Sequence, residues 1–232
     1  MFLRSRSLQA EYFDAPERTA EELRSHYTWL NRVNRLTRFE RPFTSWIPRL
    51  LGSNGCQQLQ CLDVGAGDGA LGRALSAHAR SQGWDWQFTD LDLSPHACSL
   101  NPNPRATVGS AAALPFTDRS FDVVIANTMT HHLPDDATVI THFREAARVA
   151  RRLVLICDMQ RNPAFLALLS TLLWLRRAPR DFRADGILSV RRGWKRREWE
   201  ELAQRAGLTS ARVWTEHGAR ILLAVTVQGQ DR

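Results

Sequence analysis

Apolar and polar residues alternate along the chain in blocks that predict alternating strands and helices. Strands are predicted at residues 60–64, 85–91, 105–109, 121–126 and 153–157, and the first and the last two of these segments are apolar runs. The runs FDVVIA and LVLIC are apolar throughout, as expected of central parallel strands covered on both faces. Segments of helical character separate the strands, at residues 70–82, 94–100 and 135–150. This order predicts a doubly wound parallel sheet of the α/β class.

The two ends of the chain depart from this alternation. Residues 16–39 are predicted to form a helix, because Pro16 suits a first turn, acidic residues lie near the start and arginines near the end. A second short helix is expected after Pro42, and the turn sequence at 52–55 then ends a helical cap of residues 1–55. Residues 56–232 are predicted to form one domain, closed by an antiparallel hairpin around Gly218.

An insertion interrupts the alternation at residues 158–193. It holds the apolar run PAFLALLSTLLWL at 163–175, then arginines, then a stretch around Pro179 and Gly186 that is predicted to be irregular. A helix that is apolar all round needs cover from protein, lipid or an apolar ligand. Because the run follows a predicted central strand, where α/β sheets bind ligands, we expect it to cover a substrate.

The composition is that of a globular protein, with 44% apolar and 24% charged residues among 232. These values exclude disordered and fibrous classes. The longest apolar run is shorter than the ~20 residues that span a bilayer, and no apolar signal-peptide core is visible. Four scattered cysteines have no metal-ligand spacing, which favours reduced thiols, no metal and a cytoplasmic location.

The net charge of +7 is concentrated in one segment of the chain. Residues 144–197 contain 14 basic and 4 acidic side chains, so the remainder is slightly acidic. Such a patch suggests an anionic partner, a membrane surface or only a solvated face.

The most informative motif is the sequence CLDVGAGDG at residues 61–69, where the first predicted strand ends. Its glycines allow a tight turn and a close approach to a ligand. Asp63 and Asp68 would repel the pyrophosphate of a dinucleotide, which binds at the start of the following helix in such enzymes. The acidic residues therefore favour a cationic cofactor.

This loop and the sequence DLDLSP at residues 90–95 resemble the class I S-adenosylmethionine-dependent methyltransferases. The resemblance implies a Rossmann-like sheet of about seven strands and S-adenosyl-L-methionine as the cofactor. It implies that the acidic residue after the second strand, Asp92 with Asp90 as second choice, binds the ribose. Other cofactor contacts are expected at Asp63, Gly65, Ala66, Gly67, Leu93, Ser110, Ala111 and Asn127.

One of these positions departs from the family's pattern. Family members commonly have an acidic residue near the adenine amino group where this chain has Ser110. The Ser110 hydroxyl or the Ala111 amide is left for that contact.

Two adjacent histidines follow the fourth predicted strand, in the sequence NTMTHHLP at 127–134. Methyl transfer from a sulfonium needs a base only if the nucleophile arrives protonated. Histidine titrates nearest to neutral pH, so His131 and His132 are the candidate catalytic bases. In relatives, the histidine that aligns with His132 often supports the loop instead.

The acceptor is predicted to be a small, largely apolar molecule. The chain lacks both the N-P-P-Y sequence of many amino-group methyltransferases and the P-C pair of cytosine-C5 enzymes. The segments DMQR, DGILSV and KRREW, which begin at residues 158, 185 and 195, resemble methyltransferases found with bacterial type III polyketide synthases. That resemblance implies secondary-metabolite biosynthesis and O-methylation of a phenol, enol or polyketide-type hydroxyl. Nucleic acid is a less favoured partner, and peripheral contact with a membrane stays open.

Three other functions are compatible with the same residues. A quinone-type C-methyltransferase would use the same base to ionise the hydroxyl next to the ring carbon that is methylated. An RNA methyltransferase would use the basic segment 144–197 as its binding surface. A non-catalytic protein would keep the cofactor as a scaffold.

Overall fold

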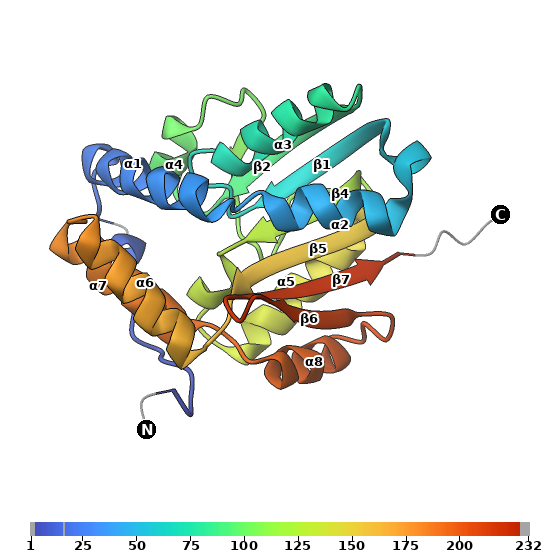
Figure 1. Ribbon diagram of the computed structural model, residues 1–232. Helices are drawn as coiled ribbons and strands as arrows, with labels where there is room; N and C mark the ends of the chain where they lie inside the picture. Colours follow the sequence, from blue (N-terminus) through green and yellow to red (C-terminus); the bar gives the residue numbers. More distant parts are fainter. Residues whose placement is uncertain (1–2, 16, 228–232) are drawn as a thin grey trace.

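The computed structural model describes residues 3–15 and 17–227, in which seven strands form one sheet in the order β3-β2-β1-β4-β5-β7-β6 (Figure 1). The first five strands are parallel, and β7 runs antiparallel to both of its neighbours. The predicted Rossmann-like class and the closing hairpin are confirmed. The strands are β1 Gln58–Val64, β2 Asp85–Asp92, β3 Ala106–Val108, β4 Phe121–Asn127, β5 Ala150–Met159, β6 Arg212–Glu216 and β7 Arg220–Thr226.

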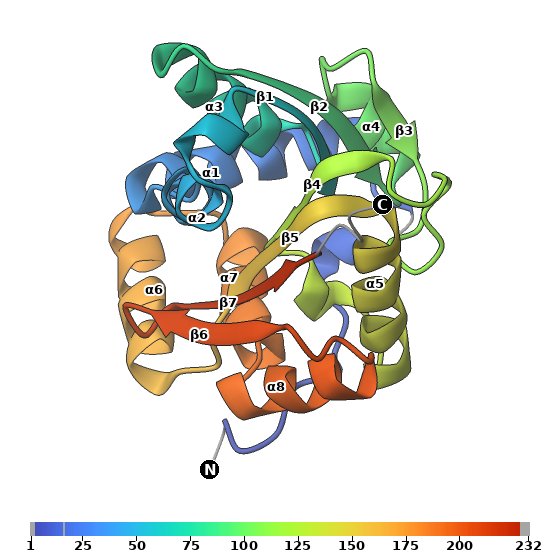
Figure 2. The same ribbon diagram turned by 90° about the vertical axis from the view of Figure 1, so that its right-hand side faces the viewer.

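Helices cover both faces of the sheet (Figure 2). Residues of β4 and β5 alternate between the two layers: Val123 and Leu153 pack on one side with α2 and α3, Val124 and Val154 on the other with α5 and α8. This double burial explains why both strands are apolar throughout. The helices are α1 Ala20–Thr37, α2 Arg41–Leu51, α3 Ala70–Ser81, α4 Pro95–Leu100, α5 Asp136–Val149, α6 Pro163–Leu175, α7 Arg180–Arg192 and α8 Arg196–Arg205, with 3-10 turns η1 Tyr12–Asp14, η2 Ser53–Cys56 and η3 Thr130–His132.

The two amino-terminal helices take different positions. Helix α1 begins at Ala20, after a capping box between Thr19 and Glu22. The predicted first-turn residue, Pro16, lies outside the described residues. Helix α2 places Phe43 and Ile47, both fully buried, in the same core layer as β1 and β4. Helix α2 therefore shares the main core, while α1 lies over the edge where the parallel strands end (Figure 1).

One prediction for the insertion is wrong. The stretch around Pro179 and Gly186, expected to be irregular, forms helix α7, which packs against α6. A Cβ at Gly186 would lie 2.9 Å from the Leu173 side chain of α6. Gly186 therefore lets the two helices approach closely instead of ending the helix, a tertiary effect that outweighs its low helix propensity.

Strand register brings the predicted cofactor residues to one edge of the sheet. Val64, the last residue of β1, pairs with Leu91 of β2 and with Ala126 of β4. The glycine loop, Asp92 and Asn127 therefore all follow at the carboxyl edge, where ligands bind in open α/β sheets. None of the helices in the described ranges is long and apolar enough to cross a membrane.

Candidate active site

The glycine loop is held tightly against neighbouring elements. Gly65, Gly67 and Gly69 all have left-handed backbone angles, with φ of 74°, 56° and 72°. A Cβ at Gly67 would lie 2.8 Å from the ring of Tyr27 on α1, and one at Gly65 would overlap Met129. Glycine is required here both for the turn and for the close approach of these side chains.

The two acidic residues at the end of β2 have different surroundings. Asp92 accepts hydrogen bonds from the backbone amides of Gly67, at 2.8 Å, and Ser94, at 2.9 Å. Asp90 accepts instead from the side-chain amides of Asn101 and Asn103, both at 2.9 Å. Asp92 thus faces the glycine loop, whereas Asp90 orders the segment after α4.

Two further predicted contacts lie beside Asp92. The Gly109 amide donates to the Asp92 carbonyl at 2.9 Å, which brings the turn of Ser110 and Ala111 to the end of β2. The side chain of Leu93, next to Asp92, is 72% exposed and offers an apolar surface at the same edge.

Asp63 places a buried carboxyl group beneath the loop. Its side chain is 1% exposed, and its Oδ2 atom has no hydrogen-bond partner in the described part of the chain. Burial, together with Asp90 and Asp92, raises the pKa of Asp63 well above its ordinary value. A cationic ligand would stabilise the ionised form of this carboxyl group. The loop therefore fits the sulfonium and ammonium groups of S-adenosylmethionine.

His131 is oriented by a carboxylate on the neighbouring strand. Its Nδ1 atom lies 2.6 Å from Oδ1 of Asp158, and its backbone amide donates to Oδ2 of Asp158 at 2.8 Å. Burial alone would raise the pKa of Asp158, but the His131 ring and the amides of Met159 and His131 outweigh it and hold the pKa below its ordinary value. An ionised carboxylate only accepts hydrogen bonds, so Nδ1 of His131 donates to Asp158, and in the neutral ring the lone pair lies on Nε2.

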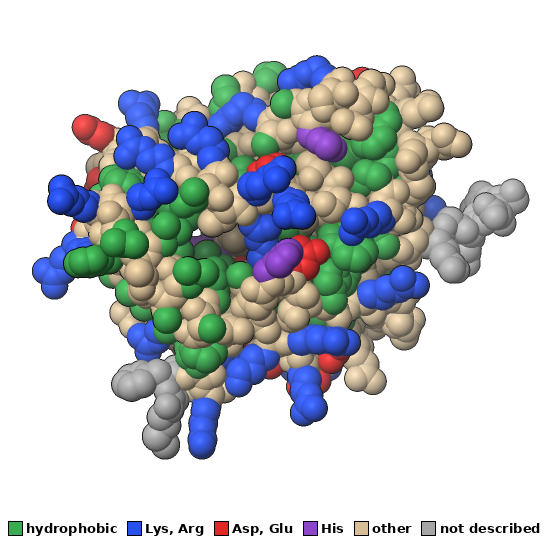
Figure 3. Space-filling view, in the orientation of Figure 1, with side chains coloured by type: hydrophobic (Ala, Val, Ile, Leu, Met, Phe, Trp, Pro, Cys, Tyr) green, Lys and Arg blue, Asp and Glu red, His purple; other side chains and the backbone are tan. Residues whose placement is uncertain are grey.

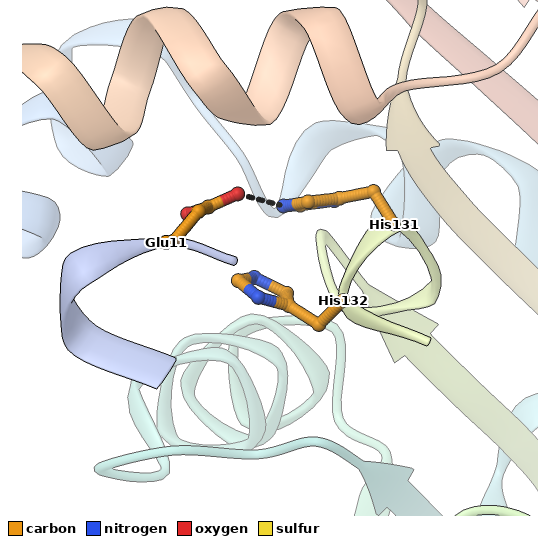
Figure 4. Close-up of side chains that lie close together, drawn as sticks. All are labelled: Glu11, His131 and His132. Atoms are coloured by element: carbon orange, nitrogen blue, oxygen red, sulfur yellow. Dashed lines mark ion pairs between the residues drawn. The ribbon is translucent and has the colours of Figure 1, made fainter. Parts of the chain in front are cut away.

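A carboxyl group from the amino-terminal segment faces this free nitrogen. Figure 4 shows Glu11 pointing at the His131 ring, with the His132 ring beside it. The distance from Glu11 Oε1 to His131 Nε2 is 3.6 Å, and neither atom has a hydrogen-bond partner among the described residues. Burial raises the pKa of Glu11 to about 7, opposed by the charge of His132. Asp14, from the same segment, lies 2.6 Å from Nδ1 of His132.

Helix α7 fixes the amino-terminal segment over the two histidines. The Asp185 carboxylate accepts from the amides of Tyr12 and Phe13, at 2.8 and 3.0 Å, and the Ser189 hydroxyl donates to Glu11 at 2.9 Å. Arg192 donates to the His131 carbonyl at 2.9 Å. The spacing of 185, 189 and 192 places these three side chains on one face of the helix.

Comparison with known proteins agrees with this geometry. Residues 62–156, from β1 to β5, match a family model described as a methyltransferase domain. These residues form a methyltransferase domain. A search of curated proteins finds no match. The resemblance to S-adenosylmethionine-dependent methyltransferases is confirmed.

Solved structures with the same fold are distant in sequence. A protein from Methanococcus maripaludis, described as an S-adenosyl-L-methionine-dependent methyltransferase, is 18% identical, with a TM-score of 0.62 over 92% of this chain and 95% of that chain. The plantazolicin methyltransferase BpumL, in complex with S-adenosylhomocysteine, is 12% identical, with a TM-score of 0.67 and coverage of 90% and 91%. PigF, also with S-adenosylhomocysteine, is 18% identical, with a TM-score of 0.59 and coverage of 94% and 63%.

The histidine cluster of this methyltransferase has the spacing of a metal site but an unfavourable charge for one. Ligand atoms of Glu11, His131 and His132 lie within 4.8 Å of one another. The Arg192 guanidinium lies 3.8 Å from Glu11 and 3.2 Å from Asp14 and already supplies a positive charge at this place. A cation here would be repelled by the guanidinium, so the charge of the cluster disfavours a metal ion.

Aromatic side chains adjoin the cluster. The His26 ring lies between Phe13, at a centroid distance of 4.0 Å, and Phe182, at 5.2 Å. Burial, with a smaller effect of the nearby His132, lowers the pKa of His26 to about 4, so this ring is neutral near pH 7. Its neutral form extends an apolar surface toward His132.

Several residues of the site were not predicted from the sequence. Asp158 lies near the end of a parallel strand, as Asp92 does, so the same signal could have identified it. Tyr27 belongs to the helical pattern of α1, and Glu11 and Asp14 lie in a segment without a motif. Their proximity to the glycine loop and the histidines arises only in the folded chain.

Proposed function

We propose that this methyltransferase transfers the methyl group of S-adenosyl-L-methionine to a hydroxyl of a small, largely apolar acceptor, such as a phenol, an enol or a polyketide hydroxyl. The observation that carries the proposal is the oriented ring of His131. Its Nδ1 is held by Asp158, and its Nε2 is buried without a partner among the described residues. A hydroxyl nucleophile needs such a proton acceptor, whereas an amine that arrives neutral does not.

In this proposal the cofactor occupies the carboxyl edge of β1 and β2. Asp63 faces its cationic end, Gly65, Ala66 and Gly67 lie against it, and the ribose hydroxyls bind Asp92. Leu93, Ser110 and Ala111 border the adenine, and Asn127 lies next to the loop at the end of β4. The exposed side chain of Leu93 and the approach of Gly109 to Asp92 support this arrangement.

The chain's own residues would contribute in two ways, by aligning the acceptor with the bound cofactor and by removing its proton. The bound cofactor supplies an electrophilic methyl group for an in-line displacement. When rigid surroundings align the acceptor with the methyl group, the activation free energy can fall by up to ~7–11 kcal/mol. His131 takes the acceptor proton at Nε2, Asp158 stabilises the charged ring, and Glu11 faces the same nitrogen at 3.6 Å. His132, held by Asp14, borders the same space.

Two parts of the chain would enclose the reaction. Within the predicted cap of residues 1–55, helix α1 is proposed to cover the cofactor, since Asn31 donates to Asp68 of the glycine loop at 2.7 Å; helix α2 belongs to the main core. Residues 158–193 are proposed to cover the acceptor, since α7 ties down the segment that faces His131. The aromatic group of Phe13, His26 and Phe182 provides an apolar wall on that side.

The proposal is tested by incubating the protein with S-adenosylmethionine and a series of 4-alkylphenols, with mass spectrometry to detect the gain of one CH₂. We expect O-methylated products, and we expect His131→Gln to lower kcat by about 10²–10⁴-fold, the range of a general base. His132→Gln is the matched control and should have a smaller effect. Binding of S-adenosylhomocysteine should be unchanged in both. Methylation at carbon, or full activity of His131→Gln, would contradict the proposal.

A further inference from the structure

Helix α6 has one packed face and one exposed apolar face. Leu169 and Leu173 are buried against Ala178, Phe182 and Val190 of the adjoining α7 region. On the outer side, Leu168, Trp174 and Leu175 are 68%, 65% and 63% exposed. Large apolar side chains exposed together in this way indicate a surface that binds a protein, a membrane or a ligand.

Arginines continue this exposed face. Arg176, Arg177 and Arg180 are exposed just beyond the end of α6, and the sequence holds no acidic residue between 159 and 180. A shallow groove joins the two kinds of side chain, lined by Trp174, Leu175, Arg177, Ala178 and Arg183. Figure 3 shows hydrophobic side chains beside clustered basic ones over α6 and α7.

These arginines differ from others on the surface in their ion pairing. Within residues 3–15 and 17–227, no carboxylate pairs with Arg176, Arg177, Arg180 or Arg183, whereas other arginines on the surface do form such pairs. Unpaired guanidinium groups bind phosphate oxygens well, because their fork of donors matches two oxygens at once.

The exposed apolar side chains and the neighbouring arginines together indicate which kind of partner this surface binds. A second copy of the chain would bring the same positive charges together, which is unfavourable. Nucleic acid would use the arginines but leave the leucines and Trp174 in water. The surface of an anionic bilayer uses both, with apolar side chains in the acyl boundary, a tryptophan at headgroup level and arginines on the phosphates.

We propose that Leu168, Trp174 and Leu175, together with Arg176, Arg177, Arg180 and Arg183, bind the surface of an anionic phospholipid bilayer. Helix α6 would lie in the interface, since its 13 residues are too few to span the hydrocarbon core. Helix α7, packed on α6, holds the segment over His131, so the bound membrane would adjoin the acceptor side of the molecule.

The test is flotation of the whole protein with vesicles of phosphatidylglycerol and phosphatidylcholine, compared with phosphatidylcholine alone, in the absence of methyl donor and acceptor. We expect the protein to float only with the anionic vesicles and to be released by high salt. The triple variant Leu168→Gln/Trp174→Gln/Leu175→Gln and the triple variant Arg176→Gln/Arg177→Gln/Arg180→Gln should each weaken partitioning at least about tenfold.

Matched controls separate this surface from general charge and hydrophobicity. Arg80→Gln/Arg105→Gln/Arg212→Gln removes the same charge elsewhere on the exposed surface, and Val108→Gln removes an exposed apolar residue on the edge strand β3. Both should float like the wild type, and circular dichroism should show that all variants fold. Failure to float, equal flotation with neutral vesicles, or unchanged flotation of the α6 variants would overturn the proposal. A dimer of the free protein that the α6 variants abolish would assign the surface to a second copy instead.

The result is independent of the proposed methyl transfer. Vesicle binding is measured without methyl donor or acceptor, so its outcome does not depend on catalysis. Loss of activity on all phenols with normal flotation would therefore count against the O-methylation proposal alone.

Discussion

The two halves of the candidate active site are assembled from the chain in different ways. The half around the glycine loop comes from consecutive strands and loops, between Asp63 and Asp92. The half around His131 draws on segments far apart in the sequence: Glu11 and Asp158 lie at its ring, and Arg192 donates to its backbone carbonyl. A local loop leaves a recognisable sequence motif, whereas a cluster assembled from distant segments leaves none.

The halves also differ in how their charges are balanced. Asp63 has a buried oxygen without a hydrogen-bond partner among the described residues and an elevated pKa, which suits a cationic ligand. Around His131, the carboxyl groups are opposed by Arg192 and by the histidines themselves. We propose that the first half binds a positive charge and that the second half holds and moves a proton.

The largest effect is expected from Asp158→Asn, which would break the half around His131. The asparagine amide would donate to His131 Nδ1, which moves the ring proton to Nε2 and removes the free lone pair. We expect kcat for a phenol to fall by about 10²–10⁴-fold, with the dissociation constant of S-adenosylhomocysteine changed less than about threefold. Steady-state kinetics measures kcat, and calorimetry measures the dissociation constant. If kcat and the affinity for S-adenosylhomocysteine fell by the same factor, the two halves of the site would not act independently.

The next effect concerns pH and is expected from Glu11→Gln. The pKa of Glu11 is about 7 in the folded protein and 4.5 ordinarily, so the folded state holds the proton more tightly. The free energy of unfolding therefore falls as pH rises from about 4.5 to above 7, and the variant lacks this loss. Relative to that of the wild type, the free energy of unfolding of Glu11→Gln should increase by on the order of 3 kcal/mol between pH 4.5 and pH 8.

Urea unfolding of both proteins at the two pH values measures this difference, in which the other titrating groups cancel. The exposed residue Glu17, replaced by glutamine, serves as the control and should show no such gain. A stability difference for Glu11→Gln that stays constant with pH would mean that Glu11 ionises normally in the fold.

The smallest effect is expected in the cofactor half, from Asp92→Ala. Loss of a charged acceptor costs about 1.5–3 kcal/mol, so S-adenosylhomocysteine should bind about 10–100-fold more weakly, while kcat at saturating cofactor changes little. The comparison variant is Asp90→Asn, which disturbs Asn101 and Asn103 and should lower thermal stability without weakening the cofactor. Calorimetric titration decides between them, and weaker binding by Asp90→Asn alone would reverse the assignment of the ribose.

Much of the fold follows from local sequence patterns. The apolar runs of β4 and β5 and the glycine loop predicted the sheet, its edge and the cofactor class, because burial and backbone geometry act residue by residue. Helix α7 was not predicted, since Gly186 and Asp185 are typical of a turn. Both act through tertiary contacts, Gly186 with Leu173 and Asp185 with the amides of Tyr12 and Phe13.

The sequence by itself determined the class of fold, the position of the cofactor loop and the identity of the two histidines. Only the tertiary structure decided what those histidines contact. Asp158 reaches His131 through the pairing of β4 with β5, and Glu11 reaches it because α7 holds the amino-terminal segment in place. Such contacts depend on how separate segments pack, and no spacing along the chain records them.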